Sequence, residues 1–288
     1  MLECPNKGKW IAGPLSLLIM MFASVPAFAY MNLSGVWNNF GVLHEDFGDR
    51  VPGPELGDYG GIPLNNAARL RADAWDASLL TVPEYQCRVH PADYVPMFAG
   101  IRIWEERDRP SQKLIAIHIH HFAWETERTI WMDGRPHPPE YAQHTSMGFS
   151  TGAWEGDMLV VHTTHLKEGW IRRNGIPRSD KGTFTERFIR HANGLTIATV
   201  IYDPSYLTEQ HIRTREYEYE MTGDIGPYPC EAVEEVERPK GTIPHHLPGT
   251  NPFLTEYSKA HGLPQEGARG GAETMYPEYF LKIHGSKK

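Results

Sequence analysis

The chain has 288 residues, a formal net charge of −8 at pH 7, eight tryptophans and 40% hydrophobic residues. The acidic balance and the lack of a long lysine and arginine cluster argue against a nucleic-acid partner. The hydrophobic and aromatic content favours a packed globular core over a disordered chain.

Residues 1–29 have the three-part layout of a secretory signal. A basic start at Lys7 and Lys9 precedes an apolar run, and Ala27 and Ala29 offer small residues to a signal peptidase. The apolar run is short for a membrane span. We therefore expect cleavage, a periplasmic or secreted mature protein, and no stable membrane insertion; an uncleaved anchor is the alternative.

Cleavage of the signal would change the number of cysteines in the mature protein. Cys4 would leave with the signal, so Cys87 and Cys230 would remain. Two thiols in an oxidising compartment can pair, and we expect a disulfide between them. The alternative is two buried free thiols.

The first elements of the mature chain are a strand and a helix. Residues 32–39 read as a strand, and the glycine, proline and aspartate between Gly48 and Pro63 predict a loop. Apolar residues at helical spacing predict a helix over residues 65–80.

Strands dominate from Pro83 to about Arg238, because hydrophobic runs alternate with turn residues. Asn193-Gly194 between two such runs is a strong hairpin signal. The predicted strands cover residues 97–105, 114–124, 128–132, 158–166, 183–191, 195–202, 211–221 and 231–236. Strands joined by short turns suggest a barrel or a sandwich. The hairpin-like connections favour one all-β, antiparallel barrel with one early helix, over residues 30–238. A Pro/Gly/His-rich extension over residues 239–288 would wrap the surface.

The strand over residues 114–124 carries the leading catalytic candidates. Side chains alternate along a strand, so His118 and His120 share one face and the neighbouring isoleucines take the other. We expect the isoleucine face to pack and the histidine face to border a cavity. The alternative is that both histidines are hydrogen-bonded lining residues or face solvent.

Two same-face histidines also suggest a metal. A zinc site needs a third ligand, for which the candidates are His144, His162 and His165. His162 is favoured, because its apolar neighbours make an inward side chain plausible. The expected protein has no cofactor, with zinc bound by His118, His120 and His162 as the alternative.

The turn from Asp133 to Pro138 gathers an acid, a guanidinium and an imidazole. Arg135 offers a planar fork for a carboxylate or a similar oxyanion, and His137 could exchange a proton near neutral pH. The alternative is a rigid loop in which Asp133 pairs with Arg135. Asp133, Trp124 and Trp154 are the expected substrate contacts.

Two other patterns carry weaker expectations. Gly148-Phe149-Ser150-Thr151-Gly152 has the letters of a nucleophile elbow, but no helix follows, so we expect Ser150 in a turn. Glu186 and Arg187 face opposite ways on a strand, and an inward charge would need a partner. We expect an outward, solvated charge there.

Several motifs together resemble a family of exported bacterial proteins of largely unassigned function. These motifs are residues 33–37, 128–138, 148–161 and 185–188, and Cys87 and Cys230 fall where that family's cysteines are expected. The resemblance implies a lipocalin-type β-barrel and no shared reaction. This chain departs from the pattern at Phe149, where a histidine is usual, and in its histidine-rich strand.

The expected function is an exported barrel enzyme, a lyase, hydratase or isomerase. It would use cofactor-free acid–base chemistry on a small apolar or aromatic compound. His118 and His120 would exchange protons, and Arg135 with His137 would hold or polarise an oxygen. The alternatives are a non-catalytic periplasmic binding protein for apolar small molecules and a metal-dependent hydrolase with a histidine site.

Overall fold

The computed structural model describes residues 31–39, 56–76, 90–97, 100–172, 174–223, 239–241 and 245–284. Three expectations lie outside these residues: the signal over residues 1–29, the Cys87–Cys230 disulfide, and the strand over residues 231–236.

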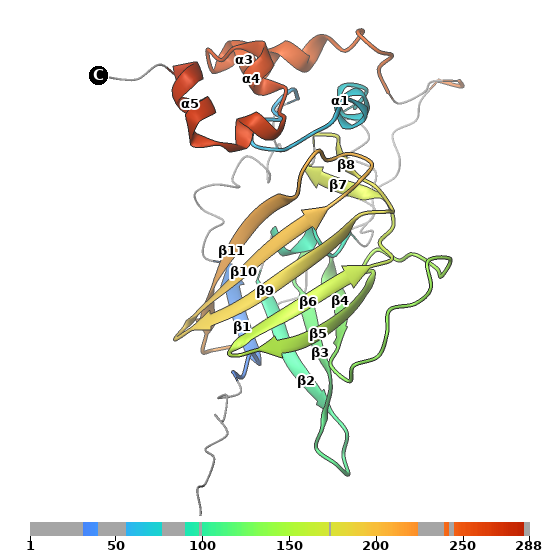
Figure 1. Cartoon of the computed structure of the whole chain (residues 1–288), viewed down its shortest axis with the longest axis vertical. Coiled ribbons are helices and arrows are strands. Elements are labelled where there is room, and N and C mark those ends of the chain that lie inside the picture. The colour runs from blue at the N-terminus through green and yellow to red at the C-terminus, as the bar shows by residue number, and fades with distance from the viewer. Residues whose placement is uncertain are drawn as a thin grey trace, which may run out of the picture.

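Among the described residues, nine strands close into a barrel (Figure 1). Their order around the barrel is β1-β11-β10-β9-β6-β5-β4-β3-β2. The strands are β1 (Gly35–Asn39), β2 (Ile101–Arg107), β3 (Leu114–His121), β4 (Thr126–Trp131), β5 (Phe149–Glu155), β6 (Met158–Thr164), β9 (Thr183–His191), β10 (Gly194–Tyr202) and β11 (His211–Glu220). The small sheet formed by β7 (Gly169–Arg172) and β8 (Ile176–Arg178) lies outside the barrel order.

The expectation of an antiparallel sheet is wrong at one place. β4 and β5 run parallel, with Ile130 opposite Ser150 and Trp131 opposite Thr151. A tight turn joins antiparallel neighbours, whereas parallel neighbours need a longer connection. Residues 132–148 form that connection, so the barrel is closed and mostly β, but its sheet is mixed.

The β9–β10 hairpin confirms the Asn-Gly signal, with its turn one residue earlier than the signal suggests. His191 pairs with Gly194, so Ala192 and Asn193 occupy the turn. Ala192 has φ 55°, in the left-handed region that favours glycine. Gly194 is a strand residue, and a Cβ there would lie 2.6 Å from Cε1 of His191.

The inward faces of the strands form two hydrophobic clusters with a polar layer between them. On β9, Phe188 belongs to the first cluster and Phe184 to the second, and Glu186 lies between them. Thr199 of β10 lies opposite Glu186 in the strand pairing and therefore belongs to the same polar layer. The first cluster lies on the inner faces of the barrel strands, and the second includes residues of α1, β7 and β8 that cap one end.

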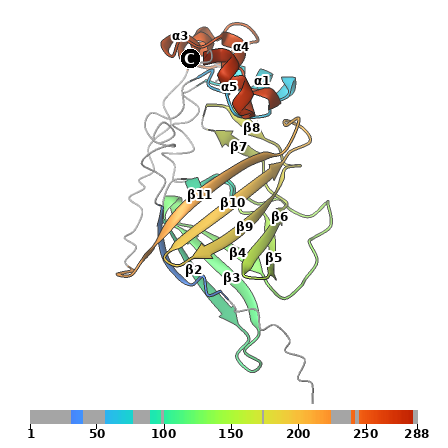
Figure 2. The ribbon, with the colours of Figure 1, turned by 60° about the vertical axis from the view of Figure 1, so that its left-hand side comes forward.

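Helix α1 (Asn66–Asp73) starts where the sequence predicts and ends earlier. The side chain of Asn65 caps it by accepting a hydrogen bond from the backbone N–H of Ala68, 3.0 Å away. The C-terminal segment forms the short helices α3 (Glu256–Ala260), α4 (Gln265–Ala268) and α5 (Pro277–His284). Figures 1 and 2 show these helices beside α1, at the end of the barrel that carries β7 and β8.

Several contacts fasten this C-terminal segment to the region of α1, and two of them are central. Arg269 forms two hydrogen bonds with the Asp73 carboxylate, of 2.6 and 2.7 Å, and the Tyr59 backbone N–H donates to the Ala268 carbonyl. A search of the described residues finds no helix with both the length and the apolar character needed to cross a membrane.

Candidate functional site

His118 and His120 lie on the outer face of the barrel. Ile117 and Ile119 of the same strand are 2% and 1% exposed and belong to the core, as expected, whereas both histidines are only partly buried. His118 Nε2 lies 2.8 Å from Oε2 of Glu106. The histidine face is therefore the outer surface of the sheet and does not border the barrel interior.

His162 is also an outward residue, because its strand neighbours Val161 and Thr163 are buried and His162 is exposed. β4 and β5 separate its strand from β3, so His118, His120 and His162 do not converge. Within the described part of the chain, no group of three or more histidine, cysteine, aspartate or glutamate side chains is placed to hold a metal ion.

The structure gives the turn at residues 133–137 the geometry of a rigid loop. The Arg135 guanidinium donates to both carboxylate oxygens of Asp133, and its Cζ lies 3.5 Å from the Trp131 ring centroid. The planar fork of Arg135 is thus occupied by Asp133 on the outer surface.

His137 lies apart from Arg135, in a row of outer-surface histidines. Its ring nitrogens lie 2.7 Å from Oγ1 of Thr164 and 2.8 Å from Oγ1 of Thr151. Burial, and then the neighbouring His162 and His165, lower the pKa of His137 below its usual value. His165 and His144 continue the row, with ring centroids 5.2 Å apart.

Ser150 is buried inside the barrel and is not a turn residue. It lies in β5, is 1% exposed, and its hydroxyl contacts Arg128 and Thr163. Trp154 lies on the same strand and packs against the barrel core.

Glu186 contradicts the expectation of an outward, solvated charge. It is 1% exposed and shares the inner face of β9 with Phe184 and Phe188. The partner that a buried acid requires is Arg128, whose Nη2 lies 2.6 Å from Oε2 of Glu186.

Arg128 is the centre of the polar layer. Its Nε donates to the Ser150 hydroxyl at 3.1 Å, and its Nη2 donates to the Thr163 hydroxyl at 2.8 Å and to Glu186. Its Cζ lies 5.1 Å from the centroid of the Phe184 ring. The remaining terminal nitrogen, Nη1, is buried and has no hydrogen-bond partner among the described residues.

Two further buried side chains on the same two paired strands have polar atoms without a partner within the structure described. His121 is 2% exposed and Thr126 is also 2% exposed. They face each other across the β3–β4 pairing, with Arg128 two residues further along the same inward face. Neither ring nitrogen of His121 nor the hydroxyl of Thr126 has a hydrogen-bond partner in the described part of the chain.

Burial decides the protonation of His121. It lowers the pKa of His121 to about 3, and the positive charge of Arg128 adds to the shift. The imidazole is therefore neutral at pH 7, with one N–H donor and one acceptor nitrogen. His121, Thr126 and Arg128 together present three unsatisfied donors in one corner of the interior, which we name the donor corner.

Two arginines of β11 also take the inner face of the barrel. Arg213 and Arg215 pair in register with the buried Thr199 and Ile197, so their side chains take the inner face. Burial, followed by the charges of Arg213, Arg172 and Arg215, lowers the pKa of His211 to about 3.

An aromatic stack lies at the turn that joins the two strands of the donor corner. Trp124 lies in the turn between β3 and β4, and the His90 ring stacks on it with centroids 3.9 Å apart and planes at 19°. Tyr94 stacks on His90 at 5.5 Å. Trp124 and Glu125 have φ values of 55° and 44°. Such backbone strain in non-glycine residues often accompanies functional sites.

Comparisons with known proteins add no family or activity. No protein-family model matches the chain, and no curated protein or solved structure is significantly similar to it.

The sequence contained a signal for His121 that its histidine-rich neighbourhood obscured. His121 has the same strand parity as Ile117 and Ile119, whose face was expected to pack. The three donors of the corner lie on two strands that follow each other in the sequence. The sequence does not indicate that Arg128 is buried, however, so it does not reveal that the inner face of these strands is polar.

Proposed function

We propose that the barrel binds a small organic anion, namely an apolar or aromatic carboxylate, with its charged group at the donor corner. The observation that carries this proposal is the set of three adjacent, buried donors without partners: His121, Thr126 and Nη1 of Arg128. An unsatisfied buried polar group costs about 1–3 kcal/mol. A carboxylate accepts several hydrogen bonds at once, including charge-assisted bonds from a guanidinium.

The surroundings support a ligand of mixed character. Two further guanidinium groups, those of Arg213 and Arg215 in β11, also take the inner face of the barrel. The buried stack of His90, Trp124 and Tyr94 gives the turn between β3 and β4 an aromatic character, which suits a ligand with an aromatic body. Binding sites of small molecules combine such apolar walls with a few convergent polar groups.

The protonation behaviour of the interior favours a binding function over acid–base catalysis. A general acid or base works best with a pKa near the operating pH, and the pKa of about 3 at His121 is far from neutral. The leading acid–base candidates, His118 and His120, lie on the outer face. The proposed protein is thus a lipocalin-like, exported binding protein. The second of the expected functions was a binding protein for apolar small molecules, and the present proposal adds a carboxylate to that ligand.

The test compares a carboxylate with its neutral counterpart. Isothermal titration with 1-naphthoate and with 1-naphthylmethanol separates recognition of the charge from recognition of the ring. Thr126→Val keeps the side-chain shape and removes the hydroxyl, so it should weaken naphthoate binding about three- to tenfold. The outward His120→Gln serves as the control in the neighbouring strand and should leave the affinity unchanged.

Naphthoate should bind more tightly than the alcohol, and His121→Leu should weaken it in the same way as Thr126→Val. Equal affinities for the two ligands, or binding that neither inward variant changes, would contradict the proposal.

A further inference from the structure

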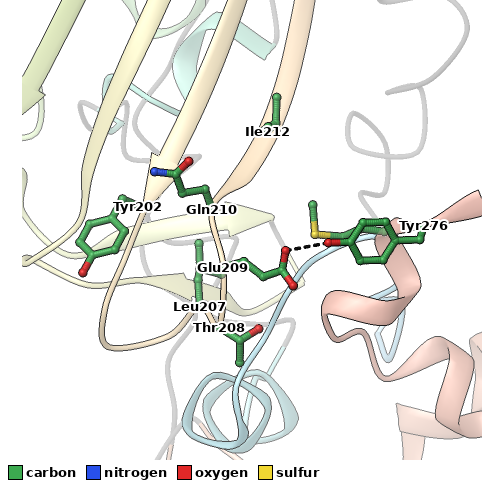
Figure 3. A pocket seen from close by; sticks show the side chains of 8 residues that line it. Tyr202, Leu207, Thr208, Glu209, Gln210, Ile212 and Tyr276 are labelled. Carbon is green, nitrogen blue, oxygen red and sulfur yellow. Dashed lines mark hydrogen bonds between the residues drawn. The ribbon is translucent and has the colours of Figure 1, made fainter.

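A pocket of about 520 Å³ lies on the outside of the barrel (Figure 3). Its walls come from the end of β10, the connection to β11, the start of β11 and the segment before α5. The lining includes Tyr202, Leu207, Glu209, Ile212, Met275 and Tyr276. The volume falls within the range of small-molecule sites.

The pocket leaves apolar surface open to solvent. Tyr202, Ile212 and Tyr276 are 51%, 57% and 49% exposed, while Leu207 beneath them is buried. Large apolar side chains gathered around one hollow mark an interaction site more often than single exposed residues do.

One acidic side chain, that of Glu209, lies among these apolar groups. Oε2 of Glu209 accepts a hydrogen bond of 2.9 Å from the Tyr276 hydroxyl, as the dashed line in Figure 3 shows. Its other oxygen, Oε1, has no hydrogen bond to any described residue. No lysine, arginine or histidine is among the residues that line the pocket.

We infer that this pocket binds a small organic cation, an ammonium with apolar or aromatic substituents. The Glu209 carboxylate would oppose the charge, and the rings of Tyr202 and Tyr276 would offer the electron-rich faces that attract organic cations. An anion would meet an uncompensated carboxylate there. The formal net charge of −8 also favours the approach of a cation.

This inference is independent of the ligand proposed for the barrel interior. The pocket uses outward residues of β10 and β11, whereas the donor corner belongs to the inner faces of β3 and β4. The two sites also favour opposite charges, so one ligand would not satisfy both.

The experiment titrates the full chain with benzyltrimethylammonium and with benzyl alcohol, followed by calorimetry. We expect saturable binding of the cation and much weaker binding of the alcohol. Glu209→Gln removes the charge with little change in shape and should weaken the cation about five- to tenfold. Glu218→Gln changes an exposed glutamate of β11 outside the pocket and should have no effect.

Tyr276 provides a matched pair of variants. Tyr276→Phe keeps the ring and frees the carboxylate from its hydrogen bond, so the cation should bind equally well or more tightly. Tyr276→Ala removes the ring and should weaken binding about fivefold. A ¹³C-methyl NMR signal of Met275, assigned by Met275→Leu, should shift on titration.

Four outcomes would overturn the inference: no saturable binding of the cation at millimolar concentration, equal binding of benzyl alcohol, an affinity unchanged in Glu209→Gln, or a Met275 signal that does not move. Thr126→Val tests independence, because it should weaken naphthoate and leave the cation unaffected.

Discussion

Arg128 and Glu186 form an ion pair across the barrel interior, with 2.6 Å between Nη2 and Oε2 and each side chain 1% exposed. β5 and β6 lie between their strands in the barrel order. The pair therefore joins two strands that share no backbone hydrogen bonds. It also sits at the boundary between the two hydrophobic clusters, where an unpaired charge would be costly.

Removal of either partner should destabilise the fold strongly. Glu186→Leu leaves the Arg128 charge buried without its carboxylate, and we expect a loss of about 3–5 kcal/mol in the free energy of unfolding. The double variant Arg128→Met/Glu186→Leu removes both charges and should cost clearly less than the sum of the single variants. Urea unfolding of the four proteins measures this coupling.

The exposed ion pair of Arg71 and Glu168 is the control, because its side chains are 56% and 48% exposed. Glu168→Gln should cost less than about 1 kcal/mol. Additive single and double effects at Arg128 and Glu186 would show that the buried pair is not coupled.

Acid should destabilise the protein through two histidines whose pKa is lowered by burial, the buried His121 and the partly buried His211. The pKa of His121 and that of His211 are each about 3 in the folded state, against about 6.5 in the unfolded chain. The unfolded state thus binds protons that the folded state does not. Above about pH 6.5 both histidines are neutral in both states, and the free energy of unfolding does not depend on them. As pH falls from about 6.5 toward 3, the free energy of unfolding decreases by up to about 1.4 kcal/mol per pH unit for each histidine.

Urea unfolding between pH 7.5 and 4.5 should show this slope. His121→Leu should reduce the slope by the share of one histidine, while His191→Gln, at a side chain that is 55% exposed, should not. A slope that survives unchanged in both His121→Leu and His211→Leu would mean that neither histidine is buried in its neutral form.

The turn of the β9–β10 hairpin should accept a stabilising substitution. Ala192 has φ 55°, a conformation that costs a non-glycine residue about 1 kcal/mol. Ala192→Gly should therefore raise the free energy of unfolding by about 0.5–1 kcal/mol. Ala198→Gly, in the middle of β10, should lower it by a similar amount. Thermal unfolding compares the two, and destabilisation by both would argue against the left-handed turn.

Strand patterns explain why part of this fold could be predicted. β9 and β11 begin at the expected residues, because their side chains alternate in character with a period of two. β5 was missed because Gly148-Phe149-Ser150-Thr151-Gly152 has small, turn-prone residues and no apolar alternation. Its strand conformation depends on pairing with β6 and β4, and such tertiary context overrides weak local propensity.

The candidate site was harder to predict than the barrel. The alternation of side chains predicted that His118 and His120 share one face of the strand. Which face points into the barrel depends on what packs against it. Ile117 and Ile119 belong to the core, so the histidine face is the outer one. Arg128 and Glu186 are 58 residues apart in the chain. No local spacing indicates such a contact, so the polar layer appears only when the strands are ordered around the barrel.

The attachment of the C-terminal helices should depend on Arg269. Its guanidinium holds the Asp73 carboxylate at the end of α1 through two hydrogen bonds. Arg269→Leu should therefore speed proteolysis and hydrogen exchange within residues 251–284, while the exchange of β9 and β10 stays unchanged. Lys259→Leu changes a cation of α3, outside this contact, and should leave both regions as they are. Equal acceleration in the strands would mean that the helices and the barrel unfold as one cooperative unit.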